Sequence, residues 1–227
     1  EIVKYSKISP EHIVCIHNGV DESWRVVKTA AVVKEGSPYF VFVGNLKPHK
    51  NLARLISAFS HLTGVLPHNL VLVGRSEGFI VGDEISKQLA VKLGSRVQFT
   101  GHIGEFELRQ LLANADGLVF PSLYEGFGLP ALEAMAAGCP VIASRTTSLP
   151  EVCGNAALYV DPLDEHDIAE KMRRLGTSKE LGEELRAKGY ARVRQFSWQS
   201  AVSKTIEVLD RVLIEKASTA SQSIQIN

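Results

Sequence analysis

The sequence predicts an α/β protein with a Rossmann-like, doubly wound parallel sheet and additional helices at its C-terminal end. Short apolar runs recur up to about residue 160 without strict polar alternation, as in strands that are buried on both faces of a sheet. Segments of helical periodicity separate these runs, which is the order of right-handed βαβ crossovers. The chain has 227 residues, of which 45% are hydrophobic and 22% charged, enough for a core without disulfides or metals.

The apolar runs give the expected strands. The first is short and covers residues 13–16. The later runs are continuous and suit a parallel sheet; they cover residues 39–43, 70–73, 97–100, 118–120, 141–143 and 158–160.

Helices are expected between the strands. One apolar stripe follows the i, i+3, i+4, i+7 rule through Leu52, Leu55, Ile56, Phe59 and Leu62, and another includes Leu108, Leu111, Leu112 and Ala115. Gly64, Gly94 and Gly138 occupy the positions where helices should end in a left-handed residue. Pro130 fits the first turn of the helix that Gly138 ends.

The C-terminal part of the sequence changes character. Residues 164–216 are expected to be helical, whereas the Ser/Thr/Gln-rich residues 217–227 are expected to lack regular structure. No repeat or linker divides the chain, so residues 1–216 are expected to form one domain. Since the first residue is Glu1 rather than methionine, we expect the chain to be an excised piece of a longer protein.

Composition excludes several classes of function. Lys+Arg and Asp+Glu number 25 each, so the chain has no charge excess for binding nucleic acid or an anionic membrane broadly. No apolar run is long enough to span a membrane. Cys15, Cys139 and Cys153 lack the spacing of a zinc site, and so few cysteines are typical of a reducing compartment, so we expect a cytoplasmic protein.

The residues that follow each strand are the candidates for a site, because ligands bind at the carboxyl ends of the strands in such sheets. The densest pattern is the loop Gly126-Phe127-Gly128, with a helix expected to start at about Leu129. Glycines allow a ligand close to the backbone, and the N–H groups at a helix start attract anions such as phosphate. A tight structural connection would have the same pattern, so the loop alone leaves both readings open.

Two carboxylates flank this loop. Glu125 lies in the loop, and Glu133 is expected in the first turn of the helix, where it would also interact favourably with the helix dipole. Carboxylates do not bind phosphate, but they accept hydrogen bonds from sugar hydroxyls. The combination predicts a ligand that contains both phosphates and sugars.

Glu125 and Glu133 are separated by seven residues, and this stretch resembles the E-x7-E signature of retaining glycosyltransferases of family 4 (group 1). Further segments occur in the family's order and extend the resemblance over nearly the whole chain; they cover residues 16–21, 42–52, 70–74, 97–101 and 196–198. The resemblance implies the C-terminal, donor-binding domain of a GT-B enzyme, with the N-terminal acceptor domain absent.

The resemblance also implies roles for individual residues. Glu133 would bind the ribose hydroxyls, and Glu125 would act in catalysis beside the donor sugar. Lys50 would neutralise the departing diphosphate, and the main chain of Ile103 would contact the base. The remaining donor-binding residues would be Gly44, Asn45, Gly126, Phe127, Gly128 and Leu129.

The sequence departs from the family pattern at Asn45, where many members carry an arginine that pairs with the lysine on the diphosphate. Lys47, His49 or Arg75 could supply that charge, although each also fits an ordinary surface residue. His102 fits a turn residue better than a catalyst.

The implied reaction is retaining transfer of a hexosyl group from a nucleotide-diphospho-sugar to a saccharide or lipid-linked acceptor, in polysaccharide biosynthesis. UDP-glucose is favoured on family frequency, and GDP-mannose stays open. No Asp-x-Asp pair occurs, so we expect neither a metal nor another cofactor. The acceptor would bind through the missing N-terminal domain. This chain alone would therefore transfer little, and the whole protein could associate with the inner membrane peripherally.

Other functions remain as alternatives. A GT-B-like epimerase or phosphorylase would share these motifs, as would a non-catalytic nucleotide-sugar-binding module. The presence of Lys50, Glu125 and Glu133 argues against the binding module. A dehydrogenase is disfavoured because no Gly-x-Gly-x-x-Gly motif follows the first strand.

Overall fold

The computed structural model describes residues 2–24, 36–45, 47–74 and 84–224. The chain divides into two compact units, and this division differs from the single domain expected over residues 1–216. The larger unit comprises Glu22–Gln195, and the smaller one combines the two ends of the chain, Glu1–Asp21 and Phe196–Asn227.

The larger unit contains a six-stranded, all-parallel sheet with the strand order β3-β2-β1-β4-β5-β6. This confirms the predicted fold class. The strands are β1 (Tyr39–Val43), β2 (Asn69–Val73), β3 (Val97–Gly101), β4 (Gly117–Phe120), β5 (Val141–Ser144) and β6 (Ala157–Val160). The central strand β1 pairs with β2 on one side, for example Phe42 with Leu72, and with β4 on the other, for example Val41 with Leu118.

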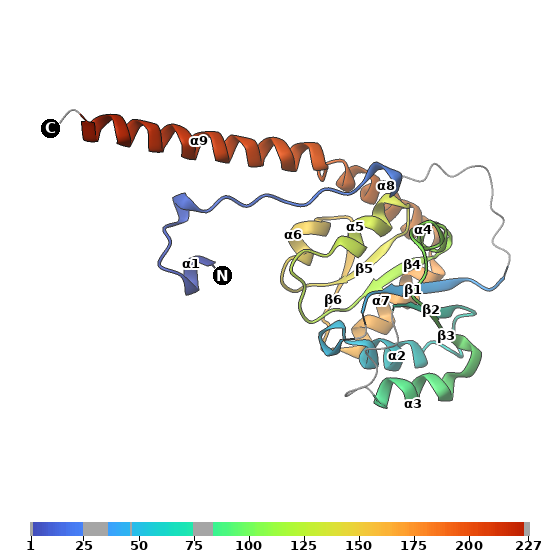
Figure 1. The fold of residues 1–227 in the computed structure, drawn as a ribbon. Helices are drawn as coiled ribbons and strands as arrows, with labels where there is room; N and C mark the ends of the chain where they lie inside the picture. The colour runs from blue at the N-terminus through green and yellow to red at the C-terminus, as the bar shows by residue number, and fades with distance from the viewer. Residues whose placement is uncertain (1, 25–35, 46, 75–83, 225–227) are drawn as a thin grey trace. The chain divides into compact units, whose positions relative to one another are not determined.

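Helices cover both faces of the sheet (Figure 1). One layer contains α2 (Leu52–Ser60), α3 (Glu84–Leu93) and α7 (Glu165–Thr177). The opposite layer contains α4 (Glu105–Asn114), α5 (Leu129–Ala136), α6 (Leu149–Cys153) and α8 (Lys179–Val193). Short 3-10 turns lie between these elements and include η2 (Glu22–Trp24), η3 (Pro48–Lys50) and η5 (Gly94–Arg96).

The larger hydrophobic core lies between the sheet and the layer of α2 and α7. Phe40 and Phe42 project from β1 onto the apolar stripe predicted for α2, where Ile56 and Phe59 are fully buried. Met172 of α7 closes the same cluster. Continuous apolar strands therefore have apolar helices on both faces, as a buried parallel sheet requires.

The smaller unit contains α1 (Ile2–Tyr5), η1 (Pro10–His12) and the long helix α9 (Trp198–Ile224). The backbone N–H of Val20 donates to the carbonyl oxygen of Phe196 at 3.2 Å. A Cβ atom at Gly19 would lie 2.2 Å from the nitrogen of Trp198, so the two chain ends approach at a point that only glycine allows. None of the described helices, α9 included, is both long and apolar enough to cross a membrane.

Some element predictions were wrong. Residues 13–16 form no strand, because this apolar run has no neighbouring strand with which to pair. Helix α2 ends at Ser60, before Gly64, whereas Gly94 and Gly138 adopt the predicted left-handed conformation with φ of 55° and 76°. Helix α9 continues to Ile224 and so includes residues that were expected to lack regular structure.

Candidate active site

The candidate site lies at the carboxyl ends of β1 and β4. These strands are neighbours, and the chain leaves β1 toward β2 but leaves β4 toward β5, in the opposite direction. The strand order therefore reverses between these two strands, and such a switch point is the usual ligand position in doubly wound sheets. The loop after β1 supplies Gly44, Asn45 and Lys50, and the loop after β4 supplies residues 121–128.

Lys50 and Glu125 meet at this switch point. Lys50 Nζ donates a hydrogen bond to Glu125 Oε1 at 2.5 Å, and the two side chains are 10% and 11% exposed. The same Nζ lies 5.0 Å from the centre of the Phe120 ring, at the end of β4. Two charged side chains that are 75 positions apart in the sequence are thus in contact and largely shielded from solvent.

Asn51 holds the loops around this pair. It is buried and adopts the left-handed conformation with φ of 62°. Its Nδ2 donates to the carbonyl oxygens of Pro121, at 3.0 Å, and of Pro162, at 2.6 Å. One amide group therefore joins the loops that follow β1, β4 and β6, and it sits directly beside Lys50.

The loop after β5 supports Glu125 from the other side. The Glu125 N–H donates to Thr147 Oγ1 at 3.1 Å, and Ser148 Oγ lies 3.0 Å from the Glu125 carbonyl oxygen and 2.9 Å from that of Phe127. Thr147 has φ of 52°, a strained conformation for a β-branched residue and one that often marks a functional loop. Thr147 and Ser148 were not among the predicted site residues, although their position shortly after a strand could have indicated them.

The start of α5 is formed by a glycine turn and has no side-chain cap. Gly128 has φ of 105°, and a Cβ there would lie 2.6 Å from Leu149 Cδ2, so the turn requires glycine. The first turn of α5 has no acidic side chain. Within the described part of the chain, the N–H groups of Gly128 and Leu129 form no hydrogen bond. The positive end of the helix dipole is therefore available to a ligand.

Glu133 lies one turn further along α5. It is the fifth residue of the helix, so the prediction that it lies in the first turn was wrong. Desolvation by burial, and to a smaller extent the negative charge of Glu105, raise the pKa of its carboxyl group from 4.5 to about 7. Among the described residues no cation pairs with this carboxylate. The fold thus leaves a desolvated acceptor that hydroxyl donors could satisfy.

The other predicted residues lie along the same edge of the sheet. Gly44 N donates to Val73 O at 3.0 Å, and a Cβ at Gly74 would lie 1.9 Å from Gly44 O, so the ends of β1 and β2 adjoin closely. Ile103 is half-buried between β3 and α4, and Gly126 and Asn45 are exposed. Three side chains were considered as sources of the charge that Asn45 lacks: Lys47 is exposed, His49 is half-buried, and Arg75 lies outside the described residues. His102, which was considered as a catalyst, is exposed.

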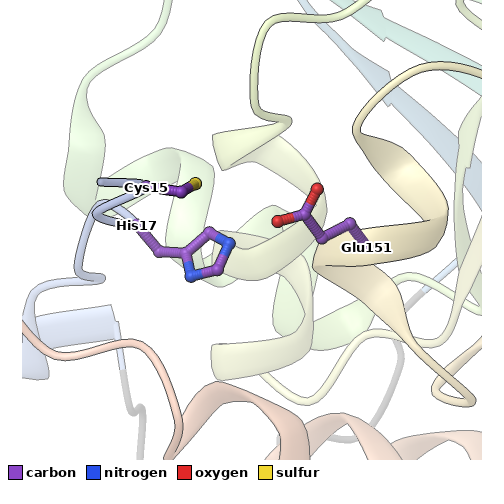
Figure 2. A group of neighbouring side chains, drawn as sticks. All are labelled: Cys15, His17 and Glu151. Atoms are coloured by element: carbon purple, nitrogen blue, oxygen red, sulfur yellow. The ribbon is translucent and has the colours of Figure 1, made fainter. Parts of the chain in front are cut away.

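Figure 2 draws Cys15, His17 and Glu151, whose side chains are of metal-binding types. Cys15 and His17 belong to the smaller unit, whereas Glu151 belongs to α6 of the larger one. We assign no metal site to them.

Residues 27–192 match the family model described as glycosyl transferases group 1. The chain belongs to this family. The match spans all six strands of the sheet and includes Lys50, Glu125 and Glu133.

Known relatives of this group 1 glycosyl transferase include two from Escherichia coli. The chain is 37% identical to O-antigen chain mannosyltransferase B over 173 residues, which cover 74% of this chain and 44% of the relative. It is 30% identical to the serotype-specific mannosyltransferase WbdA over 232 residues, which cover 96% of this chain and 28% of that relative. The chain therefore spans less than half the length of these relatives.

Among solved structures, a glycosyltransferase from Rickettsia africae has the same fold. The two structures superpose with a TM-score of 0.82 at 20% sequence identity, over 93% of this chain and 60% of the other. This agreement supports the GT-B-like arrangement of the sheet and its helices.

Proposed function

We propose that this chain is the donor-binding part of a retaining glycosyltransferase. It would bind a nucleotide-diphospho-sugar, and the whole protein would pass the glycosyl group to a saccharide or lipid-linked acceptor. The observation that carries this proposal is the buried Lys50–Glu125 pair, which lies where the sheet reverses its strand order. The chain is a member of the glycosyl transferase group 1 family, and the N-terminus of its helix α5 has backbone N–H groups without hydrogen bonds in the described part of the chain.

The geometry suits the charge changes of glycosyl transfer. When the bond between the anomeric carbon and the phosphate oxygen breaks, negative charge develops on the diphosphate. Lys50 Nζ and the N–H groups at Gly128 and Leu129 are fixed positive groups that could stabilise this charge. In this proposal they take the place of a divalent ion.

Glu125 would have two partners in succession. In the structure its carboxylate neutralises Lys50 in a nearly dry position. A bound diphosphate can take over that neutralisation, which frees Glu125 to face the donor sugar. Glu133 would accept hydrogen bonds from the ribose hydroxyls, which would compensate the desolvation of its carboxylate.

The names of the relatives bear on the donor sugar. Both Escherichia coli relatives are mannosyltransferases, one of them named for O-antigen chains. We therefore propose a mannosyl donor, GDP-mannose, and a role in building a surface polysaccharide. UDP-glucose, favoured on family frequency alone, becomes the alternative donor.

Thermal unfolding of the chain with GDP-mannose, GDP, UDP-glucose, UDP and ADP tests this function. A ligand at 100 times its dissociation constant should add about 2.7 kcal/mol of stability. A shift with guanosine ligands supports the proposed donor, and a shift with uridine ligands supports the alternative. The absence of any shift at millimolar concentrations would contradict donor binding by this chain.

Product analysis separates transfer from the other reactions that this fold could support. The full-length protein should release a nucleoside diphosphate and form a glycoside with the anomeric configuration of the donor. An epimerised nucleotide sugar, or a sugar phosphate, would instead indicate the epimerase or phosphorylase alternative.

A further inference from the structure

A cavity lies beside the candidate site, at the carboxyl ends of β5 and β6. Its volume is about 480 Å³, which is within the range of roughly 300–1,000 Å³ for small-molecule sites. Arg145 and Thr146 follow β5, Tyr159 belongs to β6, and Asp167 and Lys171 belong to α7; all of them line the cavity. The donor-binding groups proposed above lie instead at β1, β4 and α5, on the same edge of the sheet.

Two hydrogen bonds join the wall of this cavity to the loops of the candidate site. Thr146 Oγ1 donates to the carbonyl oxygen of Ser122 at 3.3 Å, in the loop that also carries Glu125. Pro162, which lines the cavity as well, accepts from Asn51 Nδ2 at 2.6 Å through its carbonyl oxygen. A molecule in the cavity would therefore contact the loops that position the candidate catalytic pair.

Arg145 supplies the cavity with hydrogen-bond donors. Its guanidinium carbon lies 5.9 Å from the centre of the Tyr159 ring, and the Tyr159 hydroxyl group donates to the carbonyl oxygen of Gly154 at 2.5 Å. With the residues that the structure describes, the guanidinium group forms neither a hydrogen bond nor an ion pair. Its N–H donors are thus held against an anchored ring without a protein acceptor. A ligand with oxygen acceptors would pair with them at a small cost in side-chain freedom.

Two aspartates supply the cavity with acceptors. Asp167 Oδ1 lies 3.0 Å from Lys171 Nζ, and Asp167 Oδ2 accepts from the N–H of Asp161 at 2.8 Å. Asp161 Oδ1 accepts from the N–H of Leu163 at 2.8 Å, whereas Asp161 Oδ2 has no hydrogen bond within the described part of the chain. The cavity therefore offers one fixed carboxylate oxygen together with the donors of Arg145, and its two cations and two carboxylates balance in charge.

We propose that this cavity binds a neutral hexosyl unit of the saccharide acceptor, with Arg145 and Asp161 as its principal contacts. This inference rests on the proposed function and extends it, because it assigns part of the acceptor to the donor-binding part of the protein. Each sugar hydroxyl both donates and accepts hydrogen bonds, so neighbouring hydroxyls can pair with an arginine and a carboxylate together. Because the charges that line the cavity cancel, they give a phosphate or a simple cation no net attraction.

Titration of the chain with mannotriose, followed through its amide chemical shifts, tests this inference. Mannotriose should shift the resonances of residues 145–147 and 161–163 in a saturable way. Arg145→Ala should weaken this binding about tenfold, as expected for the loss of one hydrogen bond to a charged group. Asp161→Asn should weaken it less, because the amide still offers an oxygen.

Arg173→Ala is the matched control for charge. Arg173 also belongs to α7, is exposed, and pairs with Glu170 rather than lining the cavity. This variant should bind mannotriose as the wild type does, and an equal loss in both arginine variants would overturn the proposed contact. The affinity should also stay constant as the salt concentration rises, because the ligand is neutral.

Kinetics of the full-length protein test the link to the acceptor. Arg145→Ala should raise the KM of the saccharide acceptor about tenfold and leave the KM of the nucleotide sugar unchanged. An unchanged acceptor KM would show that the cavity is not part of the acceptor site.

The outcomes separate this inference from the function on which it rests. Failure of mannotriose to bind at millimolar concentrations, or its displacement by inorganic phosphate, would overturn the saccharide site. So would chemical-shift changes confined to the loops after β1 and β4. Donor binding, measured separately by thermal unfolding with nucleotide sugars, would stand in each of these cases. Absence of donor binding in a chain that still binds mannotriose would overturn the proposed function and leave the saccharide site of this cavity standing.

Discussion

At the scale of single residues, Glu133 shows that a site can oppose the stability of its own fold. Its pKa rises from 4.5 to about 7 because the half-buried carboxylate is desolvated and lies near the negative charge of Glu105. Between pH 4.5 and pH 7, the Glu133 carboxyl group is therefore protonated to a greater extent in the native state than in the unfolded state. This carboxyl group therefore lowers the stability of the protein as the pH rises from 4.5 to 7.

Replacement of this carboxyl group should consequently stabilise the protein at alkaline pH. We expect Glu133→Gln to raise the free energy of unfolding by up to about 3 kcal/mol at pH 8 and by little at pH 4. Urea denaturation at the two pH values measures the difference. Glu170→Gln is a control of opposite sign, because Arg173 holds the pKa of Glu170 below its ordinary value. A Glu133→Gln variant that is less stable at pH 8 would refute the assignment.

The same residue should be needed for binding. Glu133→Ala should abolish binding of nucleotide sugars while far-ultraviolet circular dichroism stays unchanged, because the ribose loses its acceptor. Normal affinity in this variant would show that Glu133 does not bind the ribose.

The buried Lys50–Glu125 pair allows a different measurement. Lys50→Ala leaves the Glu125 carboxylate buried and unpaired, so it should cost roughly 3–5 kcal/mol of stability. In the double variant Lys50→Ala/Glu125→Ala no charge is stranded, and part of that stability should return. Thermal unfolding of the single and double variants completes the cycle, and strictly additive losses would argue against a coupled pair.

Lys50 should also discriminate between ligands. Lys50→Ala should weaken binding of a nucleoside diphosphate by about 10- to 100-fold, because a hydrogen bond to a charged group contributes about 1.5–3 kcal/mol. Binding of the bare nucleoside should change little. Equal losses for both ligands, measured by calorimetry, would remove the phosphate role of this lysine.

The chemistry of the site was predictable at this scale only in part. Lys50 and Glu125 could be chosen from their motifs, but their direct contact depends on β1 and β4 being neighbours, which no local pattern encodes. Asn51, Thr147 and Ser148 were missed because their importance lies in hydrogen bonds to distant loops.

At the scale of elements, the junction between the loop after β4 and helix α5 is the most demanding. Gly128→Ala combines a positive φ with a contact at 2.6 Å from Leu149, so it should destabilise the fold by about 1–3 kcal/mol and weaken diphosphate binding. Gly126→Ala is a matched control, because no atom lies within 4 Å of the added Cβ. Denaturant midpoints of the two variants test this, and equal midpoints would contradict it.

Most strands and helices could be predicted because burial on two faces leaves continuous apolar runs. Residues 13–16 are an exception, because they were predicted to form a strand and do not. An apolar run predicts burial, but a strand also requires a neighbouring strand with which to form hydrogen bonds. The start of α5 was predicted at Leu129 as observed, yet Glu133 was assigned to the wrong turn of that helix. Glycine at position 64 indicated a helix end that in fact occurs earlier, at Ser60.

At the scale of the whole molecule, the chain is one part of the architecture that its relatives possess. It spans 44% of the length of O-antigen chain mannosyltransferase B, and its own compact sheet unit covers Glu22–Gln195. Complete transfer is therefore a property to test in the full-length protein, whereas donor binding can be tested in this chain.

Donor binding by the whole unit should be independent of divalent metal. The proposed positive groups are Lys50 and the N-terminus of α5, and both belong to the protein. Addition of EDTA should leave the affinity for the nucleotide donor unchanged within about twofold, and magnesium or manganese should not restore binding to Lys50→Ala. A loss of affinity on chelation would show that a metal shares the diphosphate.

The bridge made by Asn51 restricts how this protein can be re-engineered. Loop exchange is the usual route to new specificity on α/β scaffolds, since the loops are treated as separable modules on a constant sheet. Here a single amide group joins three of those loops through the carbonyl oxygens of Pro121 and Pro162. A transplanted loop that displaced either carbonyl would disturb the lysine next to that amide, so these loops would have to be exchanged as a set.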